Sequence, residues 1–210
     1  MKDKRYKIKE DIQIAMSSFV LRNPVSNDKI IKYDRKDELF MNNNIILIGM
    51  PGAGKSTVGV VLAKAIGYDF IDSDLLIQSE TGKCLFEIIN EKGIDGFLDI
   101  ENRVNAHIET NHTVIATGGS VIYGEEAMEH LKSIGKVIYL KVTFESLEKR
   151  LGNLLKRGVA IRSGNTLMDL YNERVPLYEK YADYIIDEHN RDIREVVEMI
   201  QETLKGYMNK

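Results

Sequence analysis

The stretch Ile45-Ile-Leu-Ile48-Gly49-Met-Pro-Gly-Ala-Gly54-Lys55-Ser56 decides the fold of this chain. Its first four residues form a continuous apolar run, as in a strand that is buried on both faces of a sheet. Its last eight fit the pattern G-x-x-x-x-G-K-[ST], in which glycines let successive backbone N–H groups converge on phosphate oxygens. Apolar residues then recur at helical spacing: Val58, Val61, Leu62 and Ala65. Strand, loop and helix together are the context that a phosphate-binding P-loop requires.

The P-loop predicts a site for a nucleoside triphosphate with Mg²⁺. We expect Lys55 to reach the β- and γ-phosphates and the Ser56 hydroxyl to coordinate the metal. The positive end of the following helix adds attraction for phosphate. The alternative, a glycine-rich turn without a ligand, does not explain the Lys-Ser pair. The predicted nucleotide-binding residues of the loop are Gly52, Ala53, Gly54, Lys55, Ser56 and Thr57.

Strands and helices alternate after the P-loop. Apolar runs predict strands at 68–71, 114–116, 137–140 and 184–186. Gly67 is expected to end the helix that follows the P-loop, and Gly135 to cap the helix before the fourth strand. This alternation predicts a parallel sheet with helices on both faces, whose ligands bind beyond the carboxyl ends of the strands.

Two further motifs lie at such strand ends. Asp72-Ser-Asp74 follows the second strand, so one carboxylate could support Mg²⁺ while the other meets an acceptor hydroxyl. The alternative is that these acids only cap the next helix, where Asp is favoured. Thr117-Gly-Gly-Ser120 follows the third strand, and its glycines indicate close approach by a ligand or, alternatively, an ordinary tight turn.

Composition sets the remaining limits. The formal net charge of −3 provides no basic field, so nucleic acid is not an expected partner. No apolar run is long enough to span a membrane, and we expect a cytoplasmic, monomeric protein. The single cysteine, Cys84, excludes an internal disulfide and is interpreted as a small apolar residue.

The chain is expected to have two parts. Residues 1–40 lack a clear hydrophobic period, apart from one short helix predicted within residues 12–20, and are interpreted as an appendage of unknown role. Residues 41–210 form the predicted catalytic domain.

Several sequence pieces occur in a characteristic order. They are Gly-Met-x-Gly-x-Gly-Lys-Ser-Thr-Val-Gly at 49–59, Phe-Ile-Asp-Ser-Asp at 70–74, Phe-Glu-Ile-Ile at 86–89, Gly-x-x-x-Phe-x-x-x-Glu at 93–101, Thr-Gly-Gly at 117–119, Arg-Leu-Gly-Asn at 150–153 followed by Arg157, and Arg-Val-Pro-Leu-Tyr at 174–178. In this order and spacing, the chain resembles the shikimate kinase family over about residues 43–205. The resemblance implies a three-layer α/β/α fold of the nucleoside monophosphate kinase type, with a five-stranded parallel sheet in the order 2-3-1-4-5 and a mobile lid.

The resemblance also implies roles for individual residues. ATP would bind with Mg²⁺, which Ser56 would coordinate and Asp72 would support. Asp74 would hold the acceptor hydroxyl and take its proton. Arg150 would lie near the adenine, and Arg157 would be the lid arginine that meets the transferring phosphate.

The acceptor pocket would involve three more residues. Gly118 and Gly119 would line it through backbone N–H groups, and Arg174 would bind the acceptor's carboxylate. A planar, permanently charged arginine suits such recognition. Without the family pattern, Arg157 and Arg174 would each be interpreted as solvated surface arginines.

Three positions depart from the family pattern. The family usually has Phe-Arg where this chain has Phe97-Leu98, and that arginine helps to bind the shikimate carboxylate. Ser120 replaces the third glycine, and the lid arginine Arg157 is not followed by the usual proline. Loss of one charge-assisted hydrogen bond at position 98 would weaken acceptor binding by roughly ten- to a hundred-fold. Arg162, in the lid, is a candidate to compensate.

Three functions therefore remain open at the level of sequence. The first is an ATP-dependent shikimate kinase that makes shikimate 3-phosphate in aromatic amino-acid synthesis. The second is a related kinase of another small hydroxy acid, such as homoserine, which an apolar Leu98 beside a retained Arg174 would suit. The third, a nucleotide-binding regulator without turnover, needs neither Asp74 nor Arg157.

Overall fold

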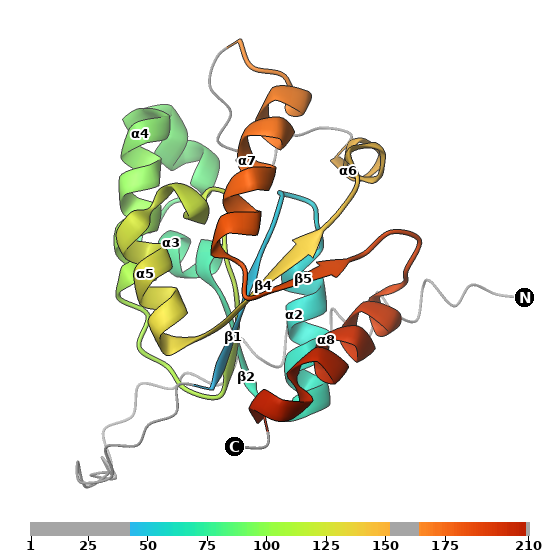
Figure 1. Ribbon diagram of the computed structural model, residues 1–210. Helices are drawn as coiled ribbons and strands as arrows, with labels where there is room; N and C mark the ends of the chain where they lie inside the picture. Colours follow the sequence, from blue (N-terminus) through green and yellow to red (C-terminus); the bar gives the residue numbers. More distant parts are fainter. Residues whose placement is uncertain (1–42, 152–163, 209–210) are drawn as a thin grey trace, which may run out of the picture. The chain divides into compact units, whose positions relative to one another are not determined.

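The computed structural model describes residues 43–151 and 164–208 of the 210-residue chain. Within these residues, the strands form one five-stranded parallel sheet in the order β2-β3-β1-β4-β5 (Figure 1). The strands are β1 (Asn44–Ile48), β2 (Asp69–Asp72), β3 (Thr113–Ala116), β4 (Gly135–Lys141) and β5 (Tyr184–Asp187). The predicted strand positions, the parallel sheet and its order are confirmed.

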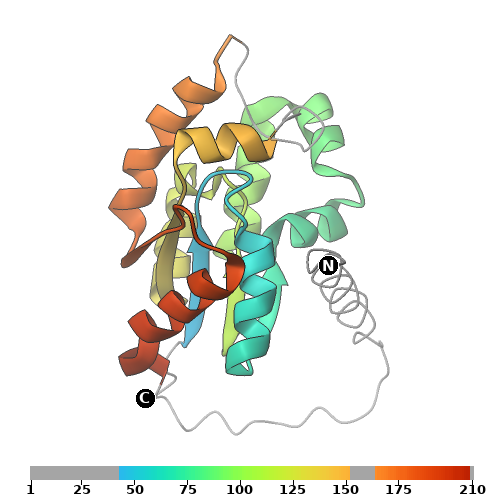
Figure 2. The ribbon, with the colours of Figure 1, turned by 90° about the vertical axis from the view of Figure 1, so that its right-hand side faces the viewer.

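Helices cover both faces of this sheet. On one face, α2 (Lys55–Ile66) and α8 (Ile193–Met208) lie side by side (Figure 2). On the other lie α4 (Leu85–Ala106), α5 (Glu125–Ile134) and α7 (Leu167–Tyr181), which Figure 1 shows on the opposite side of β1. The remaining elements are α3 (Ser73–Thr81), the 3₁₀ turn η1 (Val121–Tyr123) and α6 (Phe144–Leu151).

The alternating side chains of β1 build the two cores. Successive residues of a strand point to opposite faces, so Ile45 and Leu47 pack with α2 and α8, whereas Ile46 and Ile48 pack with α5 and α7. Every residue of β1 is buried, as the continuous apolar run predicts. The strand is therefore fixed from both sides, and so is the start of the loop that follows Ile48.

A third, smaller cluster joins α3 and α4. It contains Ile77, Ile88, Phe97, Ile100 and Val104. The helical path of α4 is interrupted at Gly93, whose φ of 72° is one that side-chain-bearing residues rarely adopt. Cys84, interpreted as a small apolar residue, lies just before α4 and is exposed. Its N–H donates to the Glu87 carboxylate.

The two predicted helix-ending glycines behave differently. Gly67 ends α2 in the left-handed conformation, with φ of 75°, as predicted. Gly135 caps α5 as predicted, but its backbone is extended and it is also the first residue of β4. A side chain there would collide with the backbone carbonyl of Asn44 on the neighbouring strand, so the need for glycine comes from strand packing.

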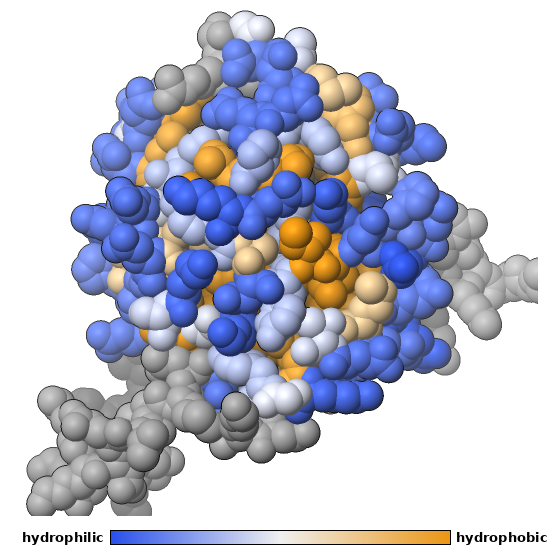
Figure 3. All heavy atoms as spheres, viewed as in Figure 1, coloured by the Kyte–Doolittle hydropathy of each residue, from blue (hydrophilic) through white to orange (hydrophobic). Residues whose placement is uncertain are grey.

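The surface is consistent with the composition. Figure 3 shows one face that is mostly hydrophilic, with apolar residues in smaller patches between the charged ones. Among the residues that the structure describes, no helix is long and apolar enough to cross a bilayer. The helix predicted within residues 12–20, like the whole segment 1–42, lies outside the described residues.

Candidate active site

A cleft of about 570 Å³ opens at the carboxyl ends of the strands. The P-loop forms its middle, with residues 51–58 lining it. One end is lined by Asp74, Phe97, Glu101, Gly118, Gly119 and Arg174, and the other by Arg150, Glu188, Arg191, Asp192, Ile193 and Val196. The cleft thus brings together all three motifs, from distant parts of the sequence.

The P-loop has the conformation that phosphate binding needs. Gly52 and Gly54 have positive φ angles of 81° and 91°, which glycine adopts at no steric cost. A side chain at Gly49 would lie 2.7 Å from the Leu140 carbonyl oxygen. The first N–H groups of α2, which begins at Lys55, have no acceptor within their own helix and are available to an anion.

Lys55 lies within this loop. Its Nζ donates to the carbonyl oxygens of Gly49, at 2.7 Å, and Met50, at 3.0 Å. Burial lowers the pKa of Lys55 to about 8, although the carboxylates of Asp74 and Asp72 oppose the shift. The amine is therefore mostly charged at pH 7, and it faces the cleft from its centre.

The two acids after β2 have separate environments. Asp72 caps α3, and its Oδ1 accepts the N–H of Asp74 at 3.0 Å. The helix-capping interpretation thus applies to Asp72. Asp74 lines the cleft instead. Burial, followed by the charge of Asp72, raises the pKa of Asp74 to about 6, so it is mostly ionised at pH 7 yet close to the pKa suited to a base.

The glycine pair after β3 is only partly as expected. The resemblance implies that the Gly118 N–H faces the acceptor. In the structure, however, this N–H donates to Ser73 Oγ at 3.1 Å. Glycine at this position also keeps the backbone close to two carboxylates. A side chain at Gly118 would collide with the carboxylates of Glu101 and Asp74. Gly119 also lines the cleft, and a side chain there would lie 2.7 Å from the ring of Pro51.

Arg174 is buried, with 1% of its surface exposed, so the interpretation as a solvated surface arginine is wrong. It reaches the cleft from α7. Its Nη1 donates to the Gly119 carbonyl at 3.1 Å, and its Nε donates to the Tyr123 hydroxyl at 3.3 Å. The guanidinium also lies 5.3 Å from the centroid of the Tyr123 ring. Arg174 is therefore held in place before any acceptor binds.

Sequence reasoning assigned no role to Glu101. It lies on α4, 1% exposed, between Asp74 and Arg174 in the acceptor end of the cleft. Burial raises the pKa of Glu101 to about 7, opposed mainly by the nearby Ser120 hydroxyl. Neither carboxylate oxygen has a well-aligned donor in the described part of the chain. A sequence signal was present, because Glu101 interrupts an apolar stripe that includes Phe97 and Val104.

Leu98 does not line the main cleft. It is half-buried and faces a second cavity of about 250 Å³, which it shares with Ile94, Tyr123, Asn165, Leu170, Glu173 and Arg174. Arg174 therefore lies between the two cavities. Position 98, where the resemblance implies an arginine, is therefore close to the predicted carboxylate-binding residue, and in this chain it is apolar.

The opposite end of the cleft holds Arg150, the residue expected near the adenine. Arg150 Nη1 donates to Glu188 Oε2 at 2.9 Å. The Glu188 side chain is 5% exposed, and burial raises the pKa of its carboxyl group. Arg157 and Arg162, the two predicted lid arginines, lie outside the described residues.

No group of three or more metal-binding His, Cys, Asp or Glu side chains occurs among the residues that the structure describes. A magnesium site of the P-loop type does not need one, because Mg²⁺ uses few protein ligands together with phosphate oxygens and water. Ser56 lines the cleft, whereas Asp72 is not among the lining residues. Both remain the residues predicted to hold the ion.

A P-loop with a central lysine, facing a buried arginine and an acid with a pKa near 6, defines a class of protein. The chain is a P-loop kinase that phosphorylates a hydroxyl group. The family model for shikimate kinase matches residues 51–205. The chain therefore belongs to the shikimate kinase family.

Individual relatives cover most of the chain. The shikimate kinase of Francisella tularensis subsp. novicida (strain U112) is 37% identical over 166 residues, which are 77% of this chain and 94% of the relative. That of Thermodesulfovibrio yellowstonii is 37% identical over 160 residues, 75% of this chain and 92% of the relative. The structure of Acinetobacter baumannii shikimate kinase in complex with shikimate matches with a TM-score of 0.72 and 34% identity, covering 79% of this chain and 94% of that one.

Proposed function

We propose that this protein transfers the γ-phosphoryl group of ATP to shikimate, forming shikimate 3-phosphate, with Mg²⁺ as cofactor. The observation that carries the proposal is the arrangement of Lys55, Asp74 and Arg174 around one cleft. Lys55 comes from the P-loop, Asp74 from the start of α3 and Arg174 from the middle of α7. Family membership supports the same reaction, because the relatives named above are shikimate kinases.

Phosphoryl transfer depends mainly on positioning and on neutralising charge at the transferring oxygens. In this chain, Lys55 supplies a buried positive charge at the centre of the cleft, and the N-terminus of α2 adds its unpaired N–H groups. Mg²⁺, when bound, would further neutralise the phosphates, with Ser56 and Asp72 beside it. We assign Arg157 the corresponding role on the lid side.

The acceptor would bind at the other end of the cleft. Arg174 would hold its carboxylate, since a guanidinium already oriented by Gly119 and Tyr123 loses little freedom on binding. Asp74 would accept the hydrogen of the reacting hydroxyl and take its proton as the oxygen attacks. Since burial raises the pKa of Asp74 to about 6, it is a stronger base than an exposed aspartate and is still mostly ionised at neutral pH.

A second candidate acceptor, homoserine, is favoured by one observation. Leu98 places an apolar side chain beside Arg174, at the position where the family carries a second cation for the shikimate carboxylate. An apolar residue there, with Arg174 retained, would suit a smaller carboxylate-bearing alcohol. For either acceptor, we also propose that the protein is a cytoplasmic monomer whose partner is a small molecule.

ATP turnover with a panel of hydroxylated acids tests the proposal. We expect ADP release that depends on the acceptor and on Mg²⁺ and that saturates with shikimate. ATP binding without acceptor-dependent turnover on any member of the panel would favour the nucleotide-binding regulator instead. Turnover with homoserine alone would move the acceptor assignment to the second candidate.

A further inference from the structure

The carbonyl oxygen of Gly119 receives hydrogen bonds from two residues of α7. Tyr178 donates its hydroxyl at 2.5 Å, and Arg174 donates Nη1 at 3.1 Å. The two donors are four residues apart and so lie on the same face of the helix. Helix α7 thus holds the loop after β3 through the Gly119 carbonyl, although Gly119 and Tyr178 are 59 residues apart in sequence.

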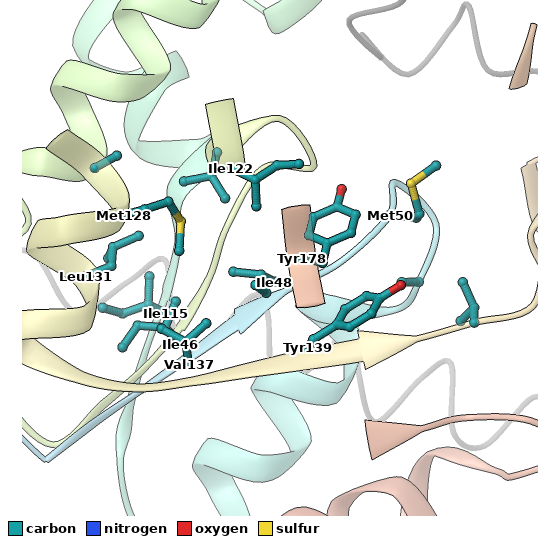
Figure 4. Packing of buried hydrophobic residues seen from close by; sticks show 14 of the residues in the cluster. Ile46, Ile48, Met50, Ile115, Ile122, Met128, Leu131, Val137, Tyr139 and Tyr178 are labelled. Atoms are coloured by element: carbon teal, nitrogen blue, oxygen red, sulfur yellow. The ribbon is translucent and has the colours of Figure 1, made fainter. Parts of the chain in front are cut away.

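The ring of Tyr178 is fixed by its surroundings. It is fully buried and stacks on Tyr139 of β4, with 5.0 Å between the ring centroids and an interplanar angle of 22°. Figure 4 shows the two rings, one from α7 and one from β4, near Met50 of the P-loop. A side chain that is fully buried and stacked on another ring holds its hydroxyl in one place.

Gly119 connects this contact to the nucleotide site. Its α-carbon lies so close to Pro51 that an added side chain would come within 2.7 Å of the proline ring. The loop is therefore enclosed between α7 on one side and the P-loop on the other. Since a peptide unit is planar and trans, a fixed Gly119 carbonyl also fixes the direction of the Ser120 N–H on the opposite edge of that unit.

We propose that Tyr178 is a positioning residue for the acceptor site. Its hydroxyl holds the Gly119–Ser120 peptide, and Arg174 donates to the same Gly119 carbonyl, so the glycine loop and the guanidinium keep one relative position. The inference rests on the proposed acceptor site but not on the identity of the acceptor.

Tyr139 provides a matched control within the same stack. Its hydroxyl is buried, and within the described residues it has no hydrogen-bond partner. Tyr139→Phe and Tyr178→Phe each remove one oxygen from the same pair of rings. Only the second removes a hydrogen bond to the acceptor loop, so a difference between the two variants measures that bond and not the stacking.

Steady-state kinetics of the two full-length variants test the proposal, using the acceptor that the wild-type protein phosphorylates. We expect Tyr178→Phe to raise the KM for the acceptor about three- to tenfold, the loss expected for one neutral hydrogen bond, while the KM for ATP stays unchanged. Tyr139→Phe should leave both KM values at the wild-type level.

Three results would overturn this role. They are an unchanged acceptor KM in Tyr178→Phe, an equal rise in the KM for ATP, or the same change in both variants. Melting curves of both variants check that each is folded at the assay temperature. If Tyr178→Phe melts at a lower temperature, both variants are assayed below that melting transition. The ratio of the acceptor KM to the ATP KM then still distinguishes a positioning role from a general loss of structure. A wild-type protein without acceptor-dependent turnover would contradict the proposed function itself, a different outcome from active enzyme with an unchanged KM.

Discussion

The two ends of the cleft differ in how firmly their charged groups are held. At the acceptor end, Arg174 and Glu101 are each 1% exposed. At the nucleotide end, Glu188 is buried too, but its partner Arg150 has a side chain that is 40% exposed, and Arg191 and Asp192 are exposed as well. Both ends belong to one cleft, with the P-loop between them.

This difference indicates where the chain determines selectivity. A charge that is buried and already oriented costs little to bring into a complex, and it penalises a ligand that fails to pair with it. Exposed charges are screened by solvent and contribute less. We therefore expect changes at the acceptor end to have large effects on turnover, and changes at the nucleotide end to have small ones.

The largest effect is expected from Asp74→Asn. An amide cannot take the proton of the acceptor hydroxyl, so kcat should fall about 10³-fold while the affinity for ATP stays nearly unchanged. Asp99→Asn, an exposed substitution on α4, should leave both parameters unchanged and serves as the control. A large loss of ATP binding in Asp74→Asn, measured by titration calorimetry, would contradict the assignment of Asp74 to the acceptor.

The pH dependence of turnover should reflect the same carboxylate. Because the pKa of Asp74 is raised to about 6, the ionised form dominates above that pH, and kcat/KM should fall about tenfold per unit below it. A pH–rate profile between 5 and 8 measures this, and a flat profile would exclude Asp74 as the base.

The stability of the fold should change in the opposite direction. Burial raises the pKa values of both Glu101 and Asp74, so the folded state binds these protons more tightly than the unfolded state does. Unfolding free energy should therefore decrease as the pH rises through about 6 to 7. Glu101→Gln should lose part of this dependence in melting curves recorded over the same pH range as the rate profile.

A gain of function is expected from Leu98→Arg. The new guanidinium would lie in the cavity of about 250 Å³ that position 98 shares with Arg174, next to the acceptor end of the cleft. We expect the KM for shikimate to fall about tenfold, with an unchanged KM for ATP, as for one added charge-assisted hydrogen bond. Leu98→Met keeps the volume without the charge and should have no such effect. An unchanged KM for shikimate in Leu98→Arg would show that position 98 does not contact the acceptor.

The smallest effect is expected at the nucleotide end, from Glu188→Gln. The substitution weakens the ion pair that orients Arg150, and the KM for ATP should rise about threefold while the KM for the acceptor stays constant. The exposed pair Lys141–Glu179 offers a control, since Glu179→Gln should change neither value. A larger effect than that of Leu98→Arg would reverse the proposed difference between the two ends.

Much of the fold could be predicted because its signals are local. A buried strand, a P-loop and a helix follow one another within 45–66, and the later strands are short apolar runs between amphipathic helices. Together with the family pattern, these signals predict the sheet and its order. Gly135 caps α5 as predicted, but the reason for glycine there, the neighbouring Asn44 backbone, lies on another strand and could not be predicted.

The site was predicted less completely, for a similar reason. The positions of Lys55 and Asp74 follow from motifs at strand ends, and that of Arg174 follows from the family pattern; the structure brings all three to one cleft. Sequence could not show that Ser73 occupies the Gly118 N–H, or that Glu101 is buried against the glycine loop. Those facts depend on contacts between residues far apart in the chain.

The measurement that tests the central claim most directly is a coupled ADP-release assay with ATP and Mg²⁺, run side by side on shikimate and homoserine. We predict saturable turnover with shikimate and a higher kcat/KM for shikimate than for homoserine. Turnover with homoserine alone would contradict the shikimate assignment and would place the change of acceptor at Leu98.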